Sequence, residues 1–172
     1  MNRFFLLLSL LLLAGCTVNV GPNPPPTLRL KLLSANVATN YRTAAGTSVI
    51  CDNRATTLLY RFRYEGRLSR WTSYLKGQTL GQIKGRRSFT PNSRGVVAVG
   101  ERSYAVQYVM SANFAPYING VAGNTLTPSA IEVVPVPQPT RIGATKLYLT
   151  LQGTNREARF VSPNIPVIIN CP

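Results

Sequence analysis

The chain has 172 residues, with 19 Lys and Arg against 5 Asp and Glu, no His and 3 Cys, which gives a formal net charge of +14. The absence of histidine excludes Ser-His-Asp and Cys-His catalysis and removes the imidazole ligands of zinc, copper and haem. The length suits one domain with a hydrophobic core of its own. We therefore expect no enzyme, no cofactor and no metal site.

The N-terminus has the composition of an export signal. Arg3 precedes an apolar stretch over residues 4–13, and small residues follow it up to Cys16. As a helix this stretch would rise only about 15 Å, roughly half of a bilayer core, so a cleaved signal peptide over residues 1–15 is favoured over a membrane span.

The residues Leu13-Ala14-Gly15-Cys16 resemble the lipobox of bacterial lipoproteins at all four positions. The resemblance implies that Cys16 becomes the N-terminus and carries fatty acyl chains such as palmitate. It also implies a lipid anchor in the cell membrane or the outer membrane, with the protein facing the periplasm or the exterior. The alternative is a plain signal peptide with an incidental cysteine. The resemblance covers the first sixteen residues, and the rest of the chain is matched to no specific family.

The segment 16–26 is predicted to be the lipidated cysteine followed by a Pro-rich tether. Four prolines and one glycine lie between Val18 and Pro26, a composition typical of extended polyproline geometry. At about 3.1 Å per residue it would hold a domain roughly 25–30 Å from the membrane.

Residues 27–172 are dominated by a period of two, which is the side-chain period of half-buried strands. Apolar and aromatic residues alternate with polar ones over 28–32, 47–51, 58–64, 71–75, 104–110, 147–151 and 165–171, with Gly and Pro between the runs. The pattern predicts a single all-β domain of seven to nine short strands. We expect an antiparallel β-sandwich, immunoglobulin-like or fibronectin-like in outline, with a small β-barrel as the runner-up.

Two interruptions remain in this pattern. Thr127-Pro128-Ser129 followed by Ala130 to Glu132 is compatible with a short turn of helix. The Pro-rich segment 134–139 could divide two domains, but too few residues follow it for a second core, so it predicts an edge strand or a crossing between sheets.

With Cys16 assigned to the lipid, Cys51 and Cys171 remain. A pair of cysteines in an exported protein predicts a disulfide, which here would join an early strand to the last one. A redox-active pair is disfavoured because there is no Cys-x-x-Cys motif.

The acidic residues are scattered along the chain. They are Asp52, Glu65, Glu101, Glu132 and Glu157. An envelope hydrolase using a pair of these carboxylates is a weaker alternative.

The positive charge is concentrated between residues 54 and 102, a segment that contains eleven basic residues and only two carboxylates. If the strands around residues 61 and 76 are neighbours, one exposed sheet face carries a stripe of cations. The candidate polyanion-binding residues are Arg61, Arg63, Arg67, Arg70, Lys76, Arg86 and Arg87. Such a stripe would bind phosphate-rich or carboxylate-rich polymers, or it could be only a solvated positive surface.

The sequence thus predicts a lipid-anchored protein of the cell envelope with a non-catalytic binding or assembly role. Its partners would be the membrane and an anionic envelope polymer. The main alternative is an accessory subunit that binds another envelope protein through a sheet edge. Nucleic acid is a weaker candidate ligand, because no single-strand binding motif is present.

Overall fold

The computed structural model of the protein describes residues 29–112, 125–126 and 130–172. The predicted signal peptide 1–15, the predicted lipidation site Cys16 and the predicted tether to residue 26 lie outside these residues. The described residues form β-strands and no helix, as follows: β1 Lys31–Thr39, β2 Tyr41–Thr43, β3 Ser48–Cys51, β4 Thr56–Glu65, β5 Arg70–Gly77, β6 Ile83–Phe89, β7 Val96–Gly100, β8 Ser103–Met110, β9 Thr125–Leu126, β10 Val134–Val136, β11 Thr140–Gln152, β12 Glu157–Val161 and β13 Ile165–Ile169.

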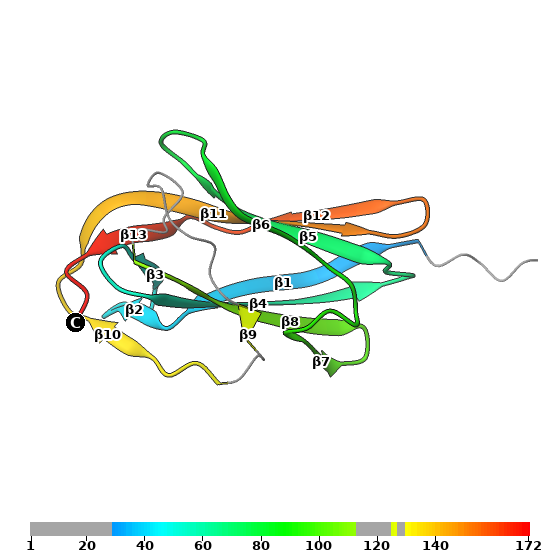
Figure 1. Cartoon of the computed structure of the whole chain (residues 1–172), viewed down its shortest axis with the longest axis horizontal. Helices are drawn as coiled ribbons and strands as arrows, with labels where there is room; N and C mark the ends of the chain where they lie inside the picture. The colour runs from blue at the N-terminus through cyan, green and yellow to red at the C-terminus, as the bar shows by residue number, and fades with distance from the viewer. Residues whose placement is uncertain (1–28, 113–124, 127–129) are drawn as a thin grey trace, which may run out of the picture.

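The strands form two sheets that pack face to face (Figure 1). Sheet 1 has the order β1-β4-β8-β7, with β9 also paired to β8. Sheet 2 has the order β10-β2-β3-β13-β11-β5-β6, with β12 also paired to β11. The predicted all-β sandwich is confirmed, and the two sheets do not close into a barrel. Most pairs are antiparallel, whereas β10 with β2 and β13 with β3 are parallel.

The core lies between the sheets and is supplied by every second residue of the long strands. Leu58, Tyr60 and Phe62 of β4 are buried against Trp71 and Leu75 of β5. The Trp71 indole donates a hydrogen bond of 3.0 Å to the Tyr60 hydroxyl, which donates one of 3.2 Å to Ser73. These bonds satisfy the Trp71 indole and the Tyr60 hydroxyl, and burial raises the pKa of Tyr60 well above its usual range.

The Pro-rich segment is an edge strand, as predicted. β10 lies at one end of sheet 2 and pairs only with β2. Pro135 in this strand and Pro137 after it have no N–H, so they remove donors from the edge.

The predicted disulfide is present between Cys51 and Cys171, whose Cα atoms are 6.1 Å apart. Both cysteines are buried in a second apolar cluster with Tyr41, Val49 and Ile168. The bond closes a loop of 120 residues, for which chain entropy gives an upper limit of about 4–5 kcal/mol of stabilisation.

The structure differs from the sequence pattern in several places. Among the described residues the first strand begins at Lys31, and strands β2, β6 and β7 had no apolar alternation to reveal them. Strand β12 alternates, with Ala158 and Phe160 directed inward, but over only five residues. Strand β6 is mostly polar, and its pairing with β5 shifts register at Ser73 and Leu75. The proposed helical turn falls partly on residues 127–129, outside the described residues, and residues 130–133 have no regular structure.

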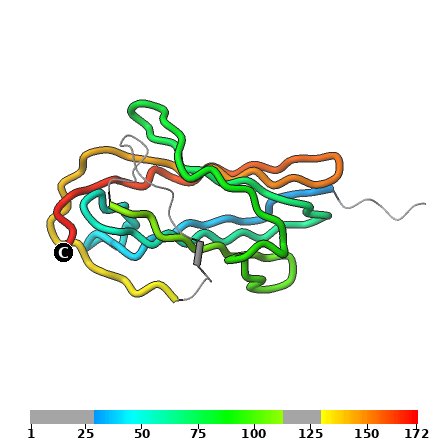
Figure 2. Tube along the Cα trace, in the orientation of Figure 1, coloured from blue at the N-terminus to red at the C-terminus, as the bar shows by residue number. Residues whose placement is uncertain are grey.

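The chain enters the sandwich at one end, where three connections between strands also lie (Figure 2). We call this the proximal end, and it comprises the entering residues 29–31 and the connections 66–69, 101–102 and 153–156. Leu30 is buried here beside Gly153. A Cβ atom on Gly153 would lie 2.6 Å from the Arg67 carbonyl oxygen and 3.4 Å from the Leu30 side chain. Only glycine therefore permits this approach of two backbones.

Replacing Gly153 by Ala should destabilise the protein by roughly 1–3 kcal/mol, because the new methyl group must displace the Arg67 backbone. Chemical denaturation followed by Trp71 fluorescence measures the change. The neighbouring Thr154 is exposed, so Thr154→Ala should change stability by no more than about 0.5 kcal/mol. Equal stability of the Gly153→Ala variant and the wild type would contradict this packing.

Candidate polyanion-binding face

The candidate basic residues do not form one stripe. Strands β4 and β5 follow each other in sequence but belong to different sheets. Arg61 and Arg63 of β4 are exposed on the outer face of sheet 1, opposite the buried Phe62. Arg70 and Lys76 of β5 lie on the outer face of sheet 2. The expectation of a single stripe is therefore wrong, because the connection after β4 crosses the sandwich.

The other three candidates are also divided. Arg67 lies on the connection between the sheets. Arg86 of β6 joins Arg70 and Lys76 on the outer face of sheet 2, because its guanidinium lies 4.9 Å from the Tyr74 ring centre. Arg87 is half-buried, and its charge acts on the buried Tyr60 and Tyr108, whose pKa values burial raises.

The outer face of sheet 2 gathers cations, hydroxyl groups and two tyrosines, and we call it the tyrosine face. It is built by the antiparallel register of β5 with β11, which runs from Gly77 opposite Thr145 to Arg70 opposite Gln152. The inward residues Trp71 and Leu75 belong to the core. The outward residues of the four strands are Arg70, Thr72, Tyr74 and Lys76 of β5, Lys146, Tyr148, Thr150 and Gln152 of β11, Arg86 and Ser88 of β6, and Glu157, Arg159 and Val161 of β12.

The centre of this face is a row of three side chains from three strands. The rings of Tyr74 and Tyr148 stack at 5.0 Å between centres with 2° between their planes. Because β5 lies between β6 and β11, Arg86 and Tyr148 approach Tyr74 from opposite sides. Both faces of the Tyr74 ring are therefore occupied, which fixes the Arg86 guanidinium in place.

Beside this row two lysines stand directly opposite each other. Lys76 is the cross-strand partner of Lys146, and both side chains are half-buried. Like charges in this position repel and destabilise the strand pair. Among the described residues no ion pair joins either lysine to a carboxylate. The repulsion makes this point of the face a suitable place for an anion.

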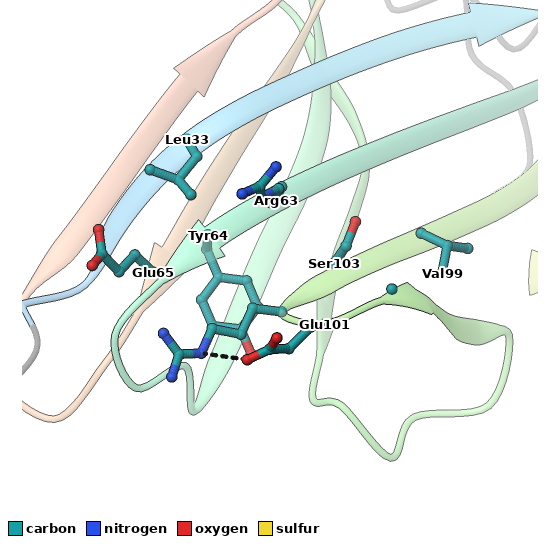
Figure 3. Close-up of a pocket in the computed structure, with 9 residues that line it drawn as sticks. Leu33, Arg63, Tyr64, Glu65, Val99, Glu101 and Ser103 are labelled. Atoms are coloured by element: carbon teal, nitrogen blue, oxygen red, sulfur yellow. Dashed lines mark ion pairs between the residues drawn. The ribbon is translucent and has the colours of Figure 1, made fainter.

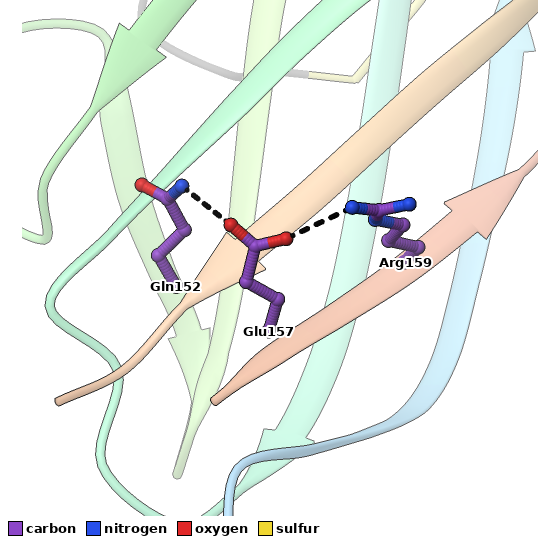
Figure 4. A network of polar contacts seen from close by, with 3 residues as sticks. All are labelled: Gln152, Glu157 and Arg159. Carbon is purple, nitrogen blue, oxygen red and sulfur yellow. Dashed lines mark hydrogen bonds and ion pairs between the residues drawn. The ribbon is translucent and has the colours of Figure 1, made fainter. Parts of the chain in front are cut away.

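The only carboxylate on the tyrosine face is bound by neighbouring side chains of the same face. Glu157 accepts hydrogen bonds from the Gln152 amide at 2.9 Å and from Arg159 at 3.1 Å (Figure 4). Gln152 in turn accepts a hydrogen bond from Arg70. The bonds from Gln152 and Arg159 lower the pKa of Glu157, which keeps it ionised. Five cations and one carboxylate therefore share this face.

Hydroxyl groups complete the face between the charges. The Thr72 and Ser88 hydroxyls lie 3.0 Å apart across β5 and β6, and Thr150 is the partner of Thr72 on the other side. Hydroxyls can donate to phosphate, sulfate or carboxylate oxygens. The face therefore combines charge and hydrogen-bond donors on a rigid sheet.

Sequence reasoning missed Lys146, Tyr148 and Arg159. The sequence did contain one signal for two of them, because the alternation around Leu147 and Leu149 places Lys146 and Tyr148 together on the outward face of their strand. What the sequence did not contain was the pairing of β11 with β5, which brings residues about 70 positions apart into register.

The structure also brings two carboxylates together. Glu65 and Glu101 line a hollow of about 620 Å³ with Arg63, Arg102 and Val99 (Figure 3). A general acid needs a dry environment that raises its pKa. The Glu101 side chain is instead 90% exposed and lies 3.9 Å from Arg102. This hollow therefore gives little support to a carboxylate-pair hydrolase.

Asp52 is the carboxyl group with the most enclosed position. It is only 6% exposed, directly follows the disulfide residue Cys51, and its N–H donates to the Ile168 carbonyl at 2.8 Å. Burial raises the pKa of Asp52, and the nearby Lys84 charge opposes this shift. The charge nearest to it in effect is that of a cation rather than of a second carboxylate, so Asp52 gives no support to a carboxylate pair.

The chain matches no protein-family model, no curated protein and no solved structure. Within the described part of the chain, no helix has the length and hydropathy needed to cross a bilayer. The same residues contain no group of three or more Cys, Asp or Glu side chains that could hold a metal ion.

Replacing Lys146 by Gln should stabilise the protein by roughly 0.2–1 kcal/mol at low salt, because it removes the repulsion with Lys76. Denaturation at low and high ionic strength measures the gain, which should shrink as salt screens the charges. The control is Lys31→Gln, because Lys31 stands opposite Glu65 and should give no gain. Equal effects of the two substitutions would show that the lysine pair has no special cost.

Proposed function

We propose that this protein is a lipid-anchored binding protein of the bacterial envelope whose tyrosine face binds an anionic polymer rich in phosphate or carboxylate groups. The observation that carries the proposal is the cross-strand pair of Lys76 and Lys146 beside Arg86, on a face whose single carboxylate is bound to other groups. An anion at this position relieves a repulsion that the folded chain otherwise retains.

The layout of the charges favours a polymer over a small ligand. Arg70 and Lys76 are six residues apart on the same strand, a distance of roughly 20 Å at 3.3 Å per residue. Along the direction of β5, Arg86 and Arg159 lie between Arg70 and Lys76. Arg86 lies next to Tyr74, and Arg159 is the cross-strand partner of Thr150. One extended polyanion along β5 can reach all of these cations, and simultaneous contacts raise its affinity.

The two tyrosines support a ligand held by charge and hydrogen bonds. The Tyr74 ring has Tyr148 on one side and Arg86 on the other. Neither face of that ring is open to a nucleic-acid base, and stacking on open rings is what binds single strands. An acidic polysaccharide or a polymer of phosphates fits this face better.

The N-terminal sequence supports an envelope location. The lipobox-like residues Leu13 to Cys16 predict a lipid anchor, and the Pro-rich tether predicts the distance between the membrane and the domain. An accessory subunit that pairs through β10 has less support, because Pro135 and Pro137 remove donors from that edge.

Replacing Lys76 and Lys146 together by Gln should weaken binding to a model polyanion, such as polyphosphate or heparin, by about tenfold or more. The slope of log Kd against the logarithm of the salt concentration should decrease by about two, because the two replaced lysines no longer displace counterions from the polymer. Titration of the full-length protein by fluorescence anisotropy at several salt concentrations measures both. The variant is expected to be at least as stable as the wild type, so unfolding would not explain the loss.

The matched control is Arg61→Gln with Arg63→Gln. It removes the same charge from the outer face of sheet 1. This variant should keep most of the affinity. Equal losses in the two double variants would mean that net charge alone attracts the polymer, and the tyrosine face would then have no dedicated role.

Replacing Cys16 by Ser should move the protein from the membrane fraction to the soluble fraction of bacteria that express the whole chain, because the anchor needs the thiol. Fractionation and intact mass of the purified protein measure the change. Thr17→Ser leaves the cysteine in place and should stay in the membrane. A Cys16→Ser protein that remains in the membrane fraction would contradict the proposed anchor.

A further inference from the structure

The proximal end of the sandwich adjoins the tyrosine face at Arg70 and Glu157, and it is the end at which the chain joins the domain. Strand β1 begins there at Lys31, which pairs with Glu65 at the end of β4 (Figure 1). The connections after β4, β7 and β11 reach the same end. Backbone contacts hold them together, with Gly153 against the Arg67 carbonyl and the Tyr64 N–H donating to the Arg102 carbonyl at 3.0 Å.

Each of these three connections carries one exposed arginine. They are Arg67, Arg102 and Arg156, and the entering segment adds Arg29 and Lys31. Glu65 stands opposite Lys31, and Glu101 lies 3.9 Å from Arg102. In the described part of the chain no carboxylate forms an ion pair with Arg29, Arg67 or Arg156.

The connections at the other end of the sandwich have a different composition. The segments 44–47, 78–82 and 137–139 contain no charged residue, and 52–55 contains Arg54 together with Asp52. The excess of cations at the proximal end is therefore not a general property of the loops.

A hollow of about 500 Å³ lies between two of the proximal connections. Its lining is polar and includes Ser69, Arg70, Thr154, Asn155, Arg156 and Glu157. The Arg156 guanidinium with hydroxyl and amide groups beside it can hold a phosphate diester, because arginine binds phosphate oxygens in pairs. Arg70 donates to Gln152, and the Glu157 carboxylate is bound by Gln152 and Arg159. The hollow lies at the end of the molecule where residue 29 enters the domain.

We propose that the proximal end docks on the anionic phospholipid headgroups of the membrane that holds the lipid anchor, with a headgroup phosphate in this hollow. The inference rests on the proposed anchor. A basic residue close to an anionic bilayer raises affinity roughly fivefold, so several arginines together hold an already tethered domain against the surface. The long strands then point away from the membrane, and the tyrosine face stands at a steep angle to it.

The test uses the full-length lipidated protein reconstituted in two kinds of vesicle, phosphatidylcholine alone and phosphatidylcholine with phosphatidylglycerol. Because the anchor holds the protein in both, only docking differs between them. Hydrogen exchange of the amides in 66–69 and 153–156 should slow by about fivefold or more in the anionic vesicles, and high salt should reverse the effect.

Two charge-reversal variants make the result specific. Arg67→Glu with Arg156→Glu should abolish the protection. Arg54→Glu with Arg141→Glu changes the net charge equally, lies away from the proximal end, and should retain the protection. Equal protection in neutral and anionic vesicles, or equal loss in both variants, would overturn the docking. Failure of the wild type to enter neutral vesicles would overturn the anchor and this inference together, while polyanion binding by the tyrosine face would be unaffected.

Discussion

The antiparallel pairing of β5 with β11 determines most of what this protein presents to its surroundings. The register is continuous over eight residue pairs, from Gly77 opposite Thr145 to Arg70 opposite Gln152. Inward, it places Trp71 and Leu75 in the core. Outward, it places Lys76 beside Lys146 and stacks Tyr74 on Tyr148. A slip of one residue would expose the tryptophan and bury the charges. The stability of the core therefore enforces the arrangement of the candidate binding face.

A second constraint is the crossing between the sheets after β4. It separates the basic residues of β4 from those of β5, which point in opposite directions. Arg61 and Arg63 face outward from sheet 1, whereas Arg70 and Lys76 face outward from sheet 2. High net charge alone would attract anions to any surface of the molecule. The register adds a fixed arrangement of cations to that general attraction, and it does so on one sheet only.

The sequence predicted the features that depend on local pattern. Alternation along β4, β5, β8, β11 and β13 identified the strands, and two cysteines in a chain predicted to be exported identified the disulfide between Cys51 and Cys171. It failed where the outcome depends on which strands are neighbours. The single stripe of arginines required β4 to lie beside β5, and Lys146 joins the site only through the pairing of β11 with β5. Strand β6 was missed because an edge strand with Lys84, Arg86 and Arg87 has little apolar pattern.

Lys76 and Lys146 can stand opposite each other in a stable fold because other interactions compensate for their repulsion. Cross-strand repulsion costs at most about 1 kcal/mol, which is small beside the contribution of a disulfide that closes a loop of 120 residues. The lysines also lie on the two strands that supply the buried side chains of Trp71, Leu75 and Leu149. The burial of these side chains stabilises the same strand pair that the lysine repulsion destabilises. Because a rigid sheet loses little conformational entropy on binding, relief of the lysine repulsion would favour the proposed binding of an anion.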